Sequence, residues 1–249
     1  MIPRSYAPDA TRAGETIDLS EDEAAHLRRV LRLADGDALQ VFNGRGTEFD
    51  AVVELVGRKR ARARLLKERA PAAEPRVRVT LAAAVLKGDA MDTVVRDAVM
   101  LGVSAILPVL AERSQTSVAA IARGRRPARW HRVAVASAKQ CGRATVPQIF
   151  PVLDLEAVAD AVAGGRLPAP ALVLAEPAAL VPSLPIFGVG DSPPVAATVL
   201  TGPEGGWTPQ EMDRLARVAR AVTLGRLTLR AEAAPVVALA ALFTRWNAF

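Results

Sequence analysis

Apolar positions divide most of the chain into alternating strands and helices. Four mostly apolar runs after residue 75 predict buried strands, at 77–85, 103–109, 171–175 and 195–200. Between the runs, apolar residues at helical spacing predict a helix over 89–101, closed by Gly102, and another over 130–141. Strands that alternate with helices are typical of a mainly parallel sheet with both faces covered. We therefore expect an α/β architecture for residues 76–249.

The first seventy residues follow a different pattern. Short alternating stretches between glycine turns predict a small β-rich unit, interrupted by one helix from a Ser20 N-cap to Leu33. Residues 70–75 read Ala-Pro-Ala-Ala-Glu-Pro, a composition typical of a linker. We therefore expect one domain over residues 1–72 and a second over 76–249.

The segment that follows the 195–200 strand carries the clearest local signal. A turn with three glycines over 202–206 lets a ligand approach the backbone closely. Thr208 then serves as an N-cap, and Glu211 three residues later completes a capping box. Because α/β sheets bind ligands at the carboxyl ends of their strands, this turn is a candidate binding loop.

A variant of this pattern returns about twenty residues later. Residues 221–224 predict a strand that ends at Gly225, and an apolar helix is expected over 231–246. Two loops at strand ends are thereby predicted to line one pocket.

Positive charge gathers in the middle of the chain. Residues 76–150 carry 12 basic and 4 acidic side chains, whereas residues 1–75 carry 13 of each kind. No acidic residue interrupts the stretch from Arg123 to Arg143, which favours contact with RNA or DNA. The alternative is a solvated helix face. A second basic run, at 58–64, is typical of an exposed strand edge.

Several classes of protein are disfavoured. The chain has no apolar stretch typical of a membrane span or signal core, so we expect a cytoplasmic protein with no membrane partner. One cysteine and two histidines argue against disulfides and a metal site. The phosphate-loop, dinucleotide-binding and nucleophile-elbow motifs are absent. Two backbone-rich loops with few catalytic side chains favour group transfer from a cofactor.

Four motifs in the right order then indicate a family. They are His26-Leu27-x-x-Val30-Leu31-Arg32-Leu33-x-x-Gly36-Asp37; Leu101-Gly102-Val103 with Pro108 and Arg113-Ser114; Gln140-x-x-Arg143-x-x-Val146-Pro147; and Gly202-Pro203-Glu204-Gly205-Gly206 with Leu224-Gly225 and Leu229-Arg230-x-Glu232-x-Ala234. Over nearly its whole length the chain resembles the ribosomal RNA small subunit methyltransferase E family. This family makes N3-methyluridine in 16S ribosomal RNA and belongs to the SPOUT class of knotted methyltransferases.

The resemblance implies an architecture and partners. We expect a PUA-like RNA-binding β-barrel followed by a SPOUT α/β domain with a C-terminal trefoil knot. The implied cofactor is S-adenosylmethionine, and the implied partners are a second copy of the chain and 16S ribosomal RNA in the small subunit. Composition and periodicity do not predict the knot, which general topology rules disfavour.

The resemblance also implies site residues. Cofactor binding is expected at Leu174, Glu176, Thr201, Gly202, Pro203, Glu204, Gly205, Leu224, Gly225, Leu229 and Arg230. RNA contacts are expected at Arg4, Arg32, Arg113, Arg126 and Arg143. The chain departs from the family pattern at Leu227, Thr228 and Ala233, which puts side-chain roles there in doubt.

Two residues are the candidates for catalysis. Uridine N3 must lose its proton to attack the sulfonium methyl group. We expect Arg230 to stabilise the negative charge on the uracil carbonyls, the alternative being an ion pair with Glu232 or Glu204. Glu204 either accepts a proton or positions its loop, and we favour positioning.

Three other functions stay open. A ribose 2′-O-methyltransferase of the same class is disfavoured because the Asn-x-Gly-x-x-x-Arg segment of those enzymes is absent. A non-catalytic RNA-binding or ribosome-assembly protein would leave the glycine loops unexplained. A SPOUT methyltransferase acting on another RNA, such as transfer RNA, is the third.

Overall fold

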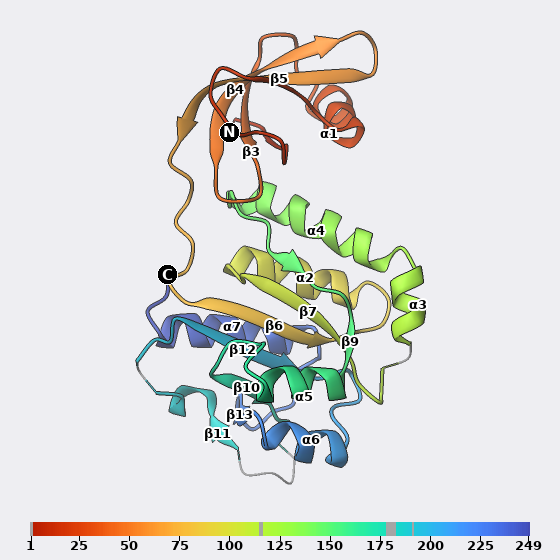
Figure 1. The fold of residues 1–249 in the computed structure, drawn as a ribbon, viewed down its shortest axis with the longest axis vertical. Helices are drawn as coiled ribbons and strands as arrows, with labels where there is room; N and C mark the ends of the chain where they lie inside the picture. Colours follow the sequence, from red (N-terminus) through yellow and green to blue (C-terminus); the bar gives the residue numbers. More distant parts are fainter. Residues whose placement is uncertain (1, 115–116, 178–182, 191) are drawn as a thin grey trace. The chain divides into compact units, whose positions relative to one another are not determined.

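The computed structural model spans residues 1–249 and describes residues 2–114, 117–177, 183–190 and 192–249 (Figure 1). The chain forms two compact units, which we call the β-rich unit (Met1–Ala73 with Val135–Val146) and the α/β unit (Glu74–Ala134 with Pro147–Phe249). Residues 135–146 thus pack with the β-rich unit, although sequence analysis placed them in the second domain.

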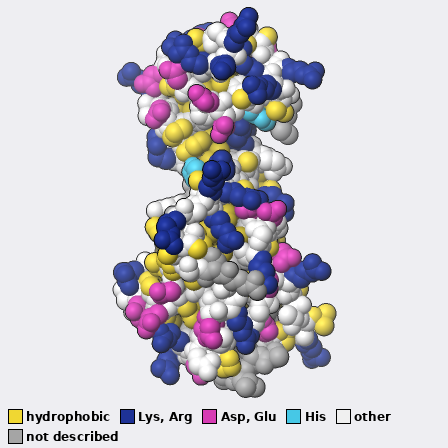
Figure 2. Space-filling view, turned by 90° about the vertical axis from the view of Figure 1, so that its right-hand side faces the viewer, with side chains coloured by type: hydrophobic (Ala, Val, Ile, Leu, Met, Phe, Trp, Pro, Cys, Tyr) yellow, Lys and Arg dark blue, Asp and Glu magenta, His cyan; other side chains and the backbone are white. Residues whose placement is uncertain are grey.

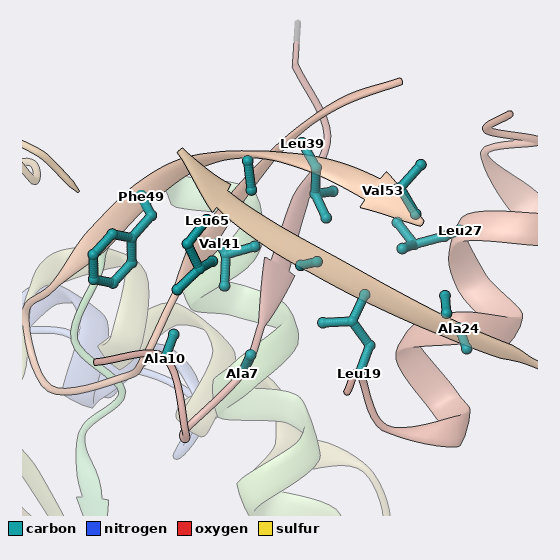
Figure 3. Packing of buried hydrophobic residues seen from close by; sticks show 13 residues of the cluster. Ala7, Ala10, Leu19, Ala24, Leu27, Leu39, Val41, Phe49, Val53 and Leu65 are labelled. Atoms are coloured by element: carbon teal, nitrogen blue, oxygen red, sulfur yellow. The ribbon is translucent and has the colours of Figure 1, made fainter. Parts of the chain in front are cut away.

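Five strands form the sheet of the β-rich unit, in the order β1 (Arg4–Tyr6), β3 (Ala38–Phe42), β4 (Glu48–Val56), β5 (Arg60–Arg69) and β2 (Thr16–Asp18). Strands β1 and β3 are parallel, and the other pairs are antiparallel. Alternate residues point inward, so Leu39, Val41, Phe49 and Leu65 are buried in one core with Leu27 (Figure 3). The burial of every second residue confirms the predicted β-rich pattern.

Strand β5 corrects the expectation that the basic run at 58–64 forms a strand edge. Its residues 62–64 pair with both β4 and β2. On its exposed face, Arg62 Nε lies 2.9 Å from Asp18 Oδ1 and Arg64 Nε lies 3.1 Å from Glu54 Oε1. Cross-strand charge pairing of this kind is a feature of strand interiors as well as edges, so the alternation alone did not identify an edge.

The first helix is shorter than its sequence pattern predicts. Helix α1 (Glu21–Ala25) begins at the predicted cap, where Ser20 Oγ accepts a hydrogen bond from Glu23 N at 3.2 Å. The expected capping box is not completed, because the Glu23 carboxylate accepts from Lys139 Nζ, at 2.8 Å from each oxygen, rather than from the Ser20 backbone. After Ala25 the chain continues as a π-helix, His26–Val30, rather than as an α-helix to Leu33.

Arg4 holds residues 138–143 against the β-rich unit. Its guanidinium donates to the carbonyls of Ala138 (2.8 Å), Lys139 (3.2 Å) and Arg143 (3.1 Å), and forms an ion pair with Glu48. These carbonyls belong to the last turn of α4 (Arg126–Cys141) and the loop beyond it, where backbone acceptors need partners. The Arg4 side chain is 10% exposed and Arg143 is 7% exposed. Both residues were expected to contact RNA, and both are largely buried in this unit.

The α/β unit is built on a parallel sheet. Its strand order is β11 (Leu184–Pro185), β13 (Arg220–Thr223), β10 (Ala171–Leu174), β12 (Ala196–Thr201), β6 (Arg78–Ala84), β7 (Ala105–Leu110) and β8 (Gln148–Ile149), with β9 (Leu153–Asp154) also paired to β7. Each of these pairs is parallel. The α/β fold with a mainly parallel sheet is therefore as predicted.

Helices cover both faces of this sheet (Figure 1). Helices α5 (Leu155–Ala163) and α6 (Pro209–Ala216) share a core with β7, β10 and β12, whereas α2 (Ala90–Leu101) packs against α7 (Ala233–Arg245). A short helix, α3 (Val118–Arg123), precedes α4, and a 3₁₀ turn, η2 (Ile186–Gly188), follows β11. Helix α2 ends at Gly102, whose φ of 99° confirms the predicted C-cap. No helix in the described ranges is long and apolar enough to cross a membrane.

Candidate active site

Three loops meet at the carboxyl ends of the neighbouring strands β13, β10 and β12. They line an open pocket of about 90 Å³. Its walls are Leu174, Ala175, Glu176 and Pro177 after β10; Gly202, Pro203, Glu204, Gly206 and Trp207 after β12; and Thr223, Leu224, Leu227, Thr228, Leu229, Ala231 and Ala234 after β13. The two loops singled out in the sequence are thus brought together, with a third between them.

The glycines of the β12 loop permit close packing around this pocket. Gly206 has a φ of +68°, and a Cβ placed on it would lie 2.2 Å from Glu176 Oε1. A Cβ on Gly202 would lie 3.2 Å from Nε1 of the Trp207 indole. A side chain at residue 206 would therefore displace the Glu176 carboxylate, and the positive φ also favours glycine there.

Trp207 places an unused hydrogen-bond donor at the pocket. Its Nε1 atom is buried and has no hydrogen-bond partner among the described residues, while the side chain lines the cavity. Buried donors are nearly always paired, so an unpaired indole N–H beside a pocket is unusual.

Glu204 holds its loop in place. Its Oε1 atom accepts a hydrogen bond from the backbone N of Lys87 at 2.8 Å. Lys87 follows β6, the strand next to β12, so the contact joins two neighbouring loops of the sheet. This geometry favours the positioning role for Glu204 over that of a proton acceptor.

The turn after β7 holds the same loop from its other side. Arg113 Nη1 donates to the carbonyl of Gly205, and a Cβ on Gly205 would lie 3.0 Å from Arg113 Cδ. The backbone N of Glu112 donates to Glu211 Oε1 at 2.7 Å. Sequence analysis placed Arg113 only among the RNA contacts and gave no signal for this role, which depends on β7 lying two strands away from β12 in the sheet.

The predicted capping box of α6 is present. Glu211 N donates to Thr208 Oγ1 at 3.3 Å, and Thr208 N donates to Glu211 Oε2 at 2.8 Å. Because Glu211 also binds Glu112, the box fixes the helix start against the β7 turn.

Arg230 lies at the start of α7, outside the pocket wall. Its carbonyl accepts from the backbone N of Ala233 and of Ala234, each at 3.0 Å. The side chain is 88% exposed, and Nη1 lies 4.0 Å from Glu232 Oε1. At that distance in solvent the ion pair is weak, which leaves the guanidinium accessible to a substrate.

The expected cofactor residues fall into two groups. Seven line the pocket: Leu174, Glu176, Gly202, Pro203, Glu204, Leu224 and Leu229. Four lie outside its wall: Thr201, Gly205, Gly225 and Arg230. Thr201 is 2% exposed within β12. Gly206, in the candidate binding loop, also lines the pocket, whereas the sequence analysis did not select Trp207, although it directly follows that glycine.

The basic segment of the α/β unit contains both paired and free arginines. Arg129 binds Asp92 at 2.5 Å and Asp89 at 2.6 Å, and its pKa is raised above the usual value by hydrogen bonds first to Asp92 and then to Asp89. Arg126 is half-buried beside Met91 and Trp130, with no polar partner among the described residues. No group of three or more His, Cys, Asp or Glu side chains in the described part of the chain is placed to hold a metal ion.

Comparison with known proteins places these features in a family. The chain matches the family models of an RNA methyltransferase domain over residues 73–243 and of an RNA methyltransferase PUA domain over 19–66. Ribosomal RNA small subunit methyltransferase E of Synechocystis sp. is 32% identical, with 90% of this chain and 72% of that protein covered. The same-named protein of Mycobacterium bovis is also 32% identical, with coverages of 98% and 93%.

Solved structures agree over almost the full length. Ribosomal RNA small subunit methyltransferase E from Neisseria gonorrhoeae, bound to S-adenosyl methionine, is 33% identical with a TM-score of 0.86, covering 99% of this chain and 98% of that one. A putative methyltransferase from Legionella pneumophila, in complex with the cofactor S-adenosyl methionine, is 27% identical with a TM-score of 0.88, covering 98% of each chain. The chain therefore belongs to the ribosomal RNA small subunit methyltransferase E family of RNA methyltransferases.

Proposed function

We propose that this protein uses S-adenosylmethionine to methylate N3 of one uridine in 16S ribosomal RNA of the small subunit. The observation that carries the proposal is the pocket between the β10, β12 and β13 loops, with its glycine backbone and its unpaired Trp207 donor. The similar chains from N. gonorrhoeae and L. pneumophila bind S-adenosyl methionine.

The pocket lining fits this cofactor chemically. Leu174, Leu224 and Leu229 offer apolar walls for an adenosine, and exposed backbone groups of the loops offer hydrogen bonds. The carboxylate of Glu176 lines the pocket and suits a cationic ligand. S-adenosylmethionine, when bound, supplies a methyl group made electrophilic by its positive sulfonium.

The residues of the chain then act on the uridine. The exposed guanidinium of Arg230 stabilises the negative charge that uracil gains when N3 loses its proton. Glu204 keeps the β12 loop in place through Lys87 N. Leu227 and Thr228, where the chain departs from the family pattern, line the pocket and contribute through backbone and apolar contact.

We assign RNA binding to the PUA-like domain at residues 1–72 and methyl transfer to the SPOUT domain at 76–249. Arg126, with the exposed residues Arg123, Arg125 and Arg132, supports RNA contact by the second domain. Ala233, Val237 and Ala241 form a partly exposed apolar stripe on α7, which supports a homodimer. The trefoil knot and a closed barrel are part of the same proposal, with the insertion of β12 between β10 and β6 as support for the knot.

Mass spectrometry of 16S ribosomal RNA tests the proposal. Small subunits from a strain without this gene are incubated with the purified protein and S-adenosylmethionine, and the expected product is N3-methyluridine at one position. A ribose 2′-O-methyl group instead would show that the atom assigned is wrong. Cofactor binding without transfer would favour another RNA substrate, and RNA binding without cofactor binding would favour the non-catalytic alternative.

A further inference from the structure

Two apolar side chains of the β-rich unit face solvent within a group of cations. Val30 is 65% exposed and Leu31 is 37% exposed, at the end of the π-helix. We call them, together with the exposed residues Arg29, Arg32, Arg58, Lys59 and Arg60, the π-turn patch. Figure 2 shows how densely Lys and Arg side chains cover parts of the molecular surface.

The π-helix is what turns the apolar side chains outward. In an α-helix, Leu27, Val30 and Leu31 would share one face, because residues three and four apart are neighbours. Here Leu31 N bonds to His26 O at 3.1 Å, a π-type bond, and only Leu27 is fully buried (Figure 3). π-turns are rare and are frequent at functional sites. The local sequence favours burial of Val30 and Leu31, and the fold exposes them.

Arg32 occupies a backbone position that favours glycine. Its φ is +53°, and the bond from Leu33 N to Leu27 O at 3.0 Å closes the helix end around it. Glycine is the usual residue at such a left-handed helix end, because other side chains are strained there. The strained position and the lack of a polar partner for its side chain among the described residues point to a role for the Arg32 guanidinium itself.

Arg28 brings the basic turn between β4 and β5 beside the π-helix. Its Nη2 atom donates to the carbonyls of Gly57 at 2.7 Å and Arg60 at 2.8 Å. The side chains of Arg58, Lys59 and Arg60 are exposed, and in the described part of the chain none has an acidic partner. The π-turn patch therefore combines two exposed apolar side chains with positive charges on the π-helix segment and on the neighbouring turn.

We propose that the π-turn patch binds single-stranded RNA, with Val30 and Leu31 against an unstacked base and Arg32, Arg58 and Lys59 on the flanking phosphates. Apolar side chains contact the faces of unstacked bases in many nucleic-acid complexes, and arginines neutralise phosphates. An acidic protein surface would suit the cations, but the uncharged centre between them fits a base better. The inference rests on the proposed function for its RNA substrate.

Fluorescence anisotropy with a short labelled single-stranded RNA, and with its duplex, tests the patch. Val30→Ser/Leu31→Ser is expected to weaken single-strand binding about tenfold with little change for the duplex, and to leave the salt dependence unchanged. Arg32→Ala is expected to lower the slope of log affinity against log salt by about 0.7, the value for one phosphate contact on a single strand.

A second arginine variant separates binding from folding. Arg32→Gly removes the same side chain as Arg32→Ala but relieves the backbone strain. It should therefore melt about 2 °C higher than Arg32→Ala while binding RNA equally weakly. Controls are Leu66→Ser and Lys67→Ala, exposed residues on β5 that lie roughly 20 Å along the strand from Arg60. They should bind RNA like the natural protein.

Each other outcome is decisive. Unchanged RNA affinity in all patch variants would overturn the proposal and would favour a protein partner for the patch. Equal losses in the two control variants, or equal losses of duplex and single strand, would overturn a specific base contact. The patch variants could behave as expected while the natural protein neither binds S-adenosylmethionine nor transfers a methyl group. That result would contradict the proposed function but support the RNA site.

Discussion

At the scale of single residues, the pocket depends on atoms whose surroundings the sequence does not predict. Trp207 was not chosen in the sequence analysis, because a tryptophan beside a glycine turn is an ordinary packing residue. Only the structure shows that its Nε1 atom is buried without a partner beside the cavity. The glycines were predictable as sites of close approach, yet the group that Gly206 approaches, the Glu176 carboxylate, lies thirty residues away in sequence.

Trp207→Phe removes this donor and keeps most of the ring. We expect the free protein to melt at the same temperature or slightly higher, since a buried unpaired donor is lost. Affinity for S-adenosylmethionine should fall about fivefold, equivalent to roughly 1 kcal/mol, the usual net value of one hydrogen bond. Calorimetric titration and a thermal melt measure both effects. Cofactor affinity equal to that of the natural protein would show that the donor is not used.

Gly206→Ala tests the close approach of the β10 and β12 loops. The new methyl group would displace the Glu176 carboxylate, and the φ of +68° would be strained for alanine. We expect cofactor affinity to fall at least tenfold, or by about 1.4 kcal/mol. The control is Gly190→Ala, where a Cβ meets no atom within 4 Å and φ is outside the left-handed region. Equal affinities for the two variants would argue against a cofactor site in this pocket.

At the scale of elements, local signals predicted what is locally determined. The capping box of α6 and the glycine end of α2 depend on residues within one turn, and both were predicted from sequence. The end of α1 was not, because the chain changes to π-type hydrogen bonding from His26 onward. The assignment of residues 135–146 to the β-rich unit likewise depends on Arg4, over 130 residues away. Contacts between distant segments decide these boundaries, and periodicity carries no information about them.

The contact between Arg113 and Gly205 gives a prediction that separates two roles. If Arg113 holds the β12 loop, Arg113→Ala should raise the dissociation constant for S-adenosylmethionine severalfold and leave the salt dependence of RNA binding unchanged. Arg126→Ala, which removes an arginine without a polar partner in the described chain, should show the reverse pattern. Arg113→Lys should restore part of the cofactor affinity by keeping one donor. A reduced salt slope with unchanged cofactor affinity would return Arg113 to the RNA contacts.

The pair formed by Lys139 and Glu23 is expected to matter for stability. Their side chains are 17% and 10% exposed, so removing one partner leaves a charge that is poorly solvated. Lys139→Ala should lower the free energy of unfolding by about 2 kcal/mol. The double variant Lys139→Ala/Glu23→Gln should lose less than this, because no uncompensated carboxylate is left. Denaturant titrations of the two single variants and the double variant measure this coupling. Strictly additive losses would show that the ion pair contributes little.

At the scale of the whole molecule, the pocket belongs to the α/β unit alone, and its loops are joined to their neighbours by single hydrogen bonds. Cofactor binding should therefore protect backbone amides in a defined order. Protection from hydrogen exchange is expected first in the loops after β10, β12 and β13. Because Glu204 bonds to Lys87 N and Arg113 to Gly205 O, the loops after β6 and β7 should follow. Strands β3 to β5 have their own core, so their amides should exchange at the same rate with and without cofactor. Equal protection of the amides in those strands would mean that cofactor binding orders both units together. The hydrogen bonds between the loops would then not explain the pattern of protection.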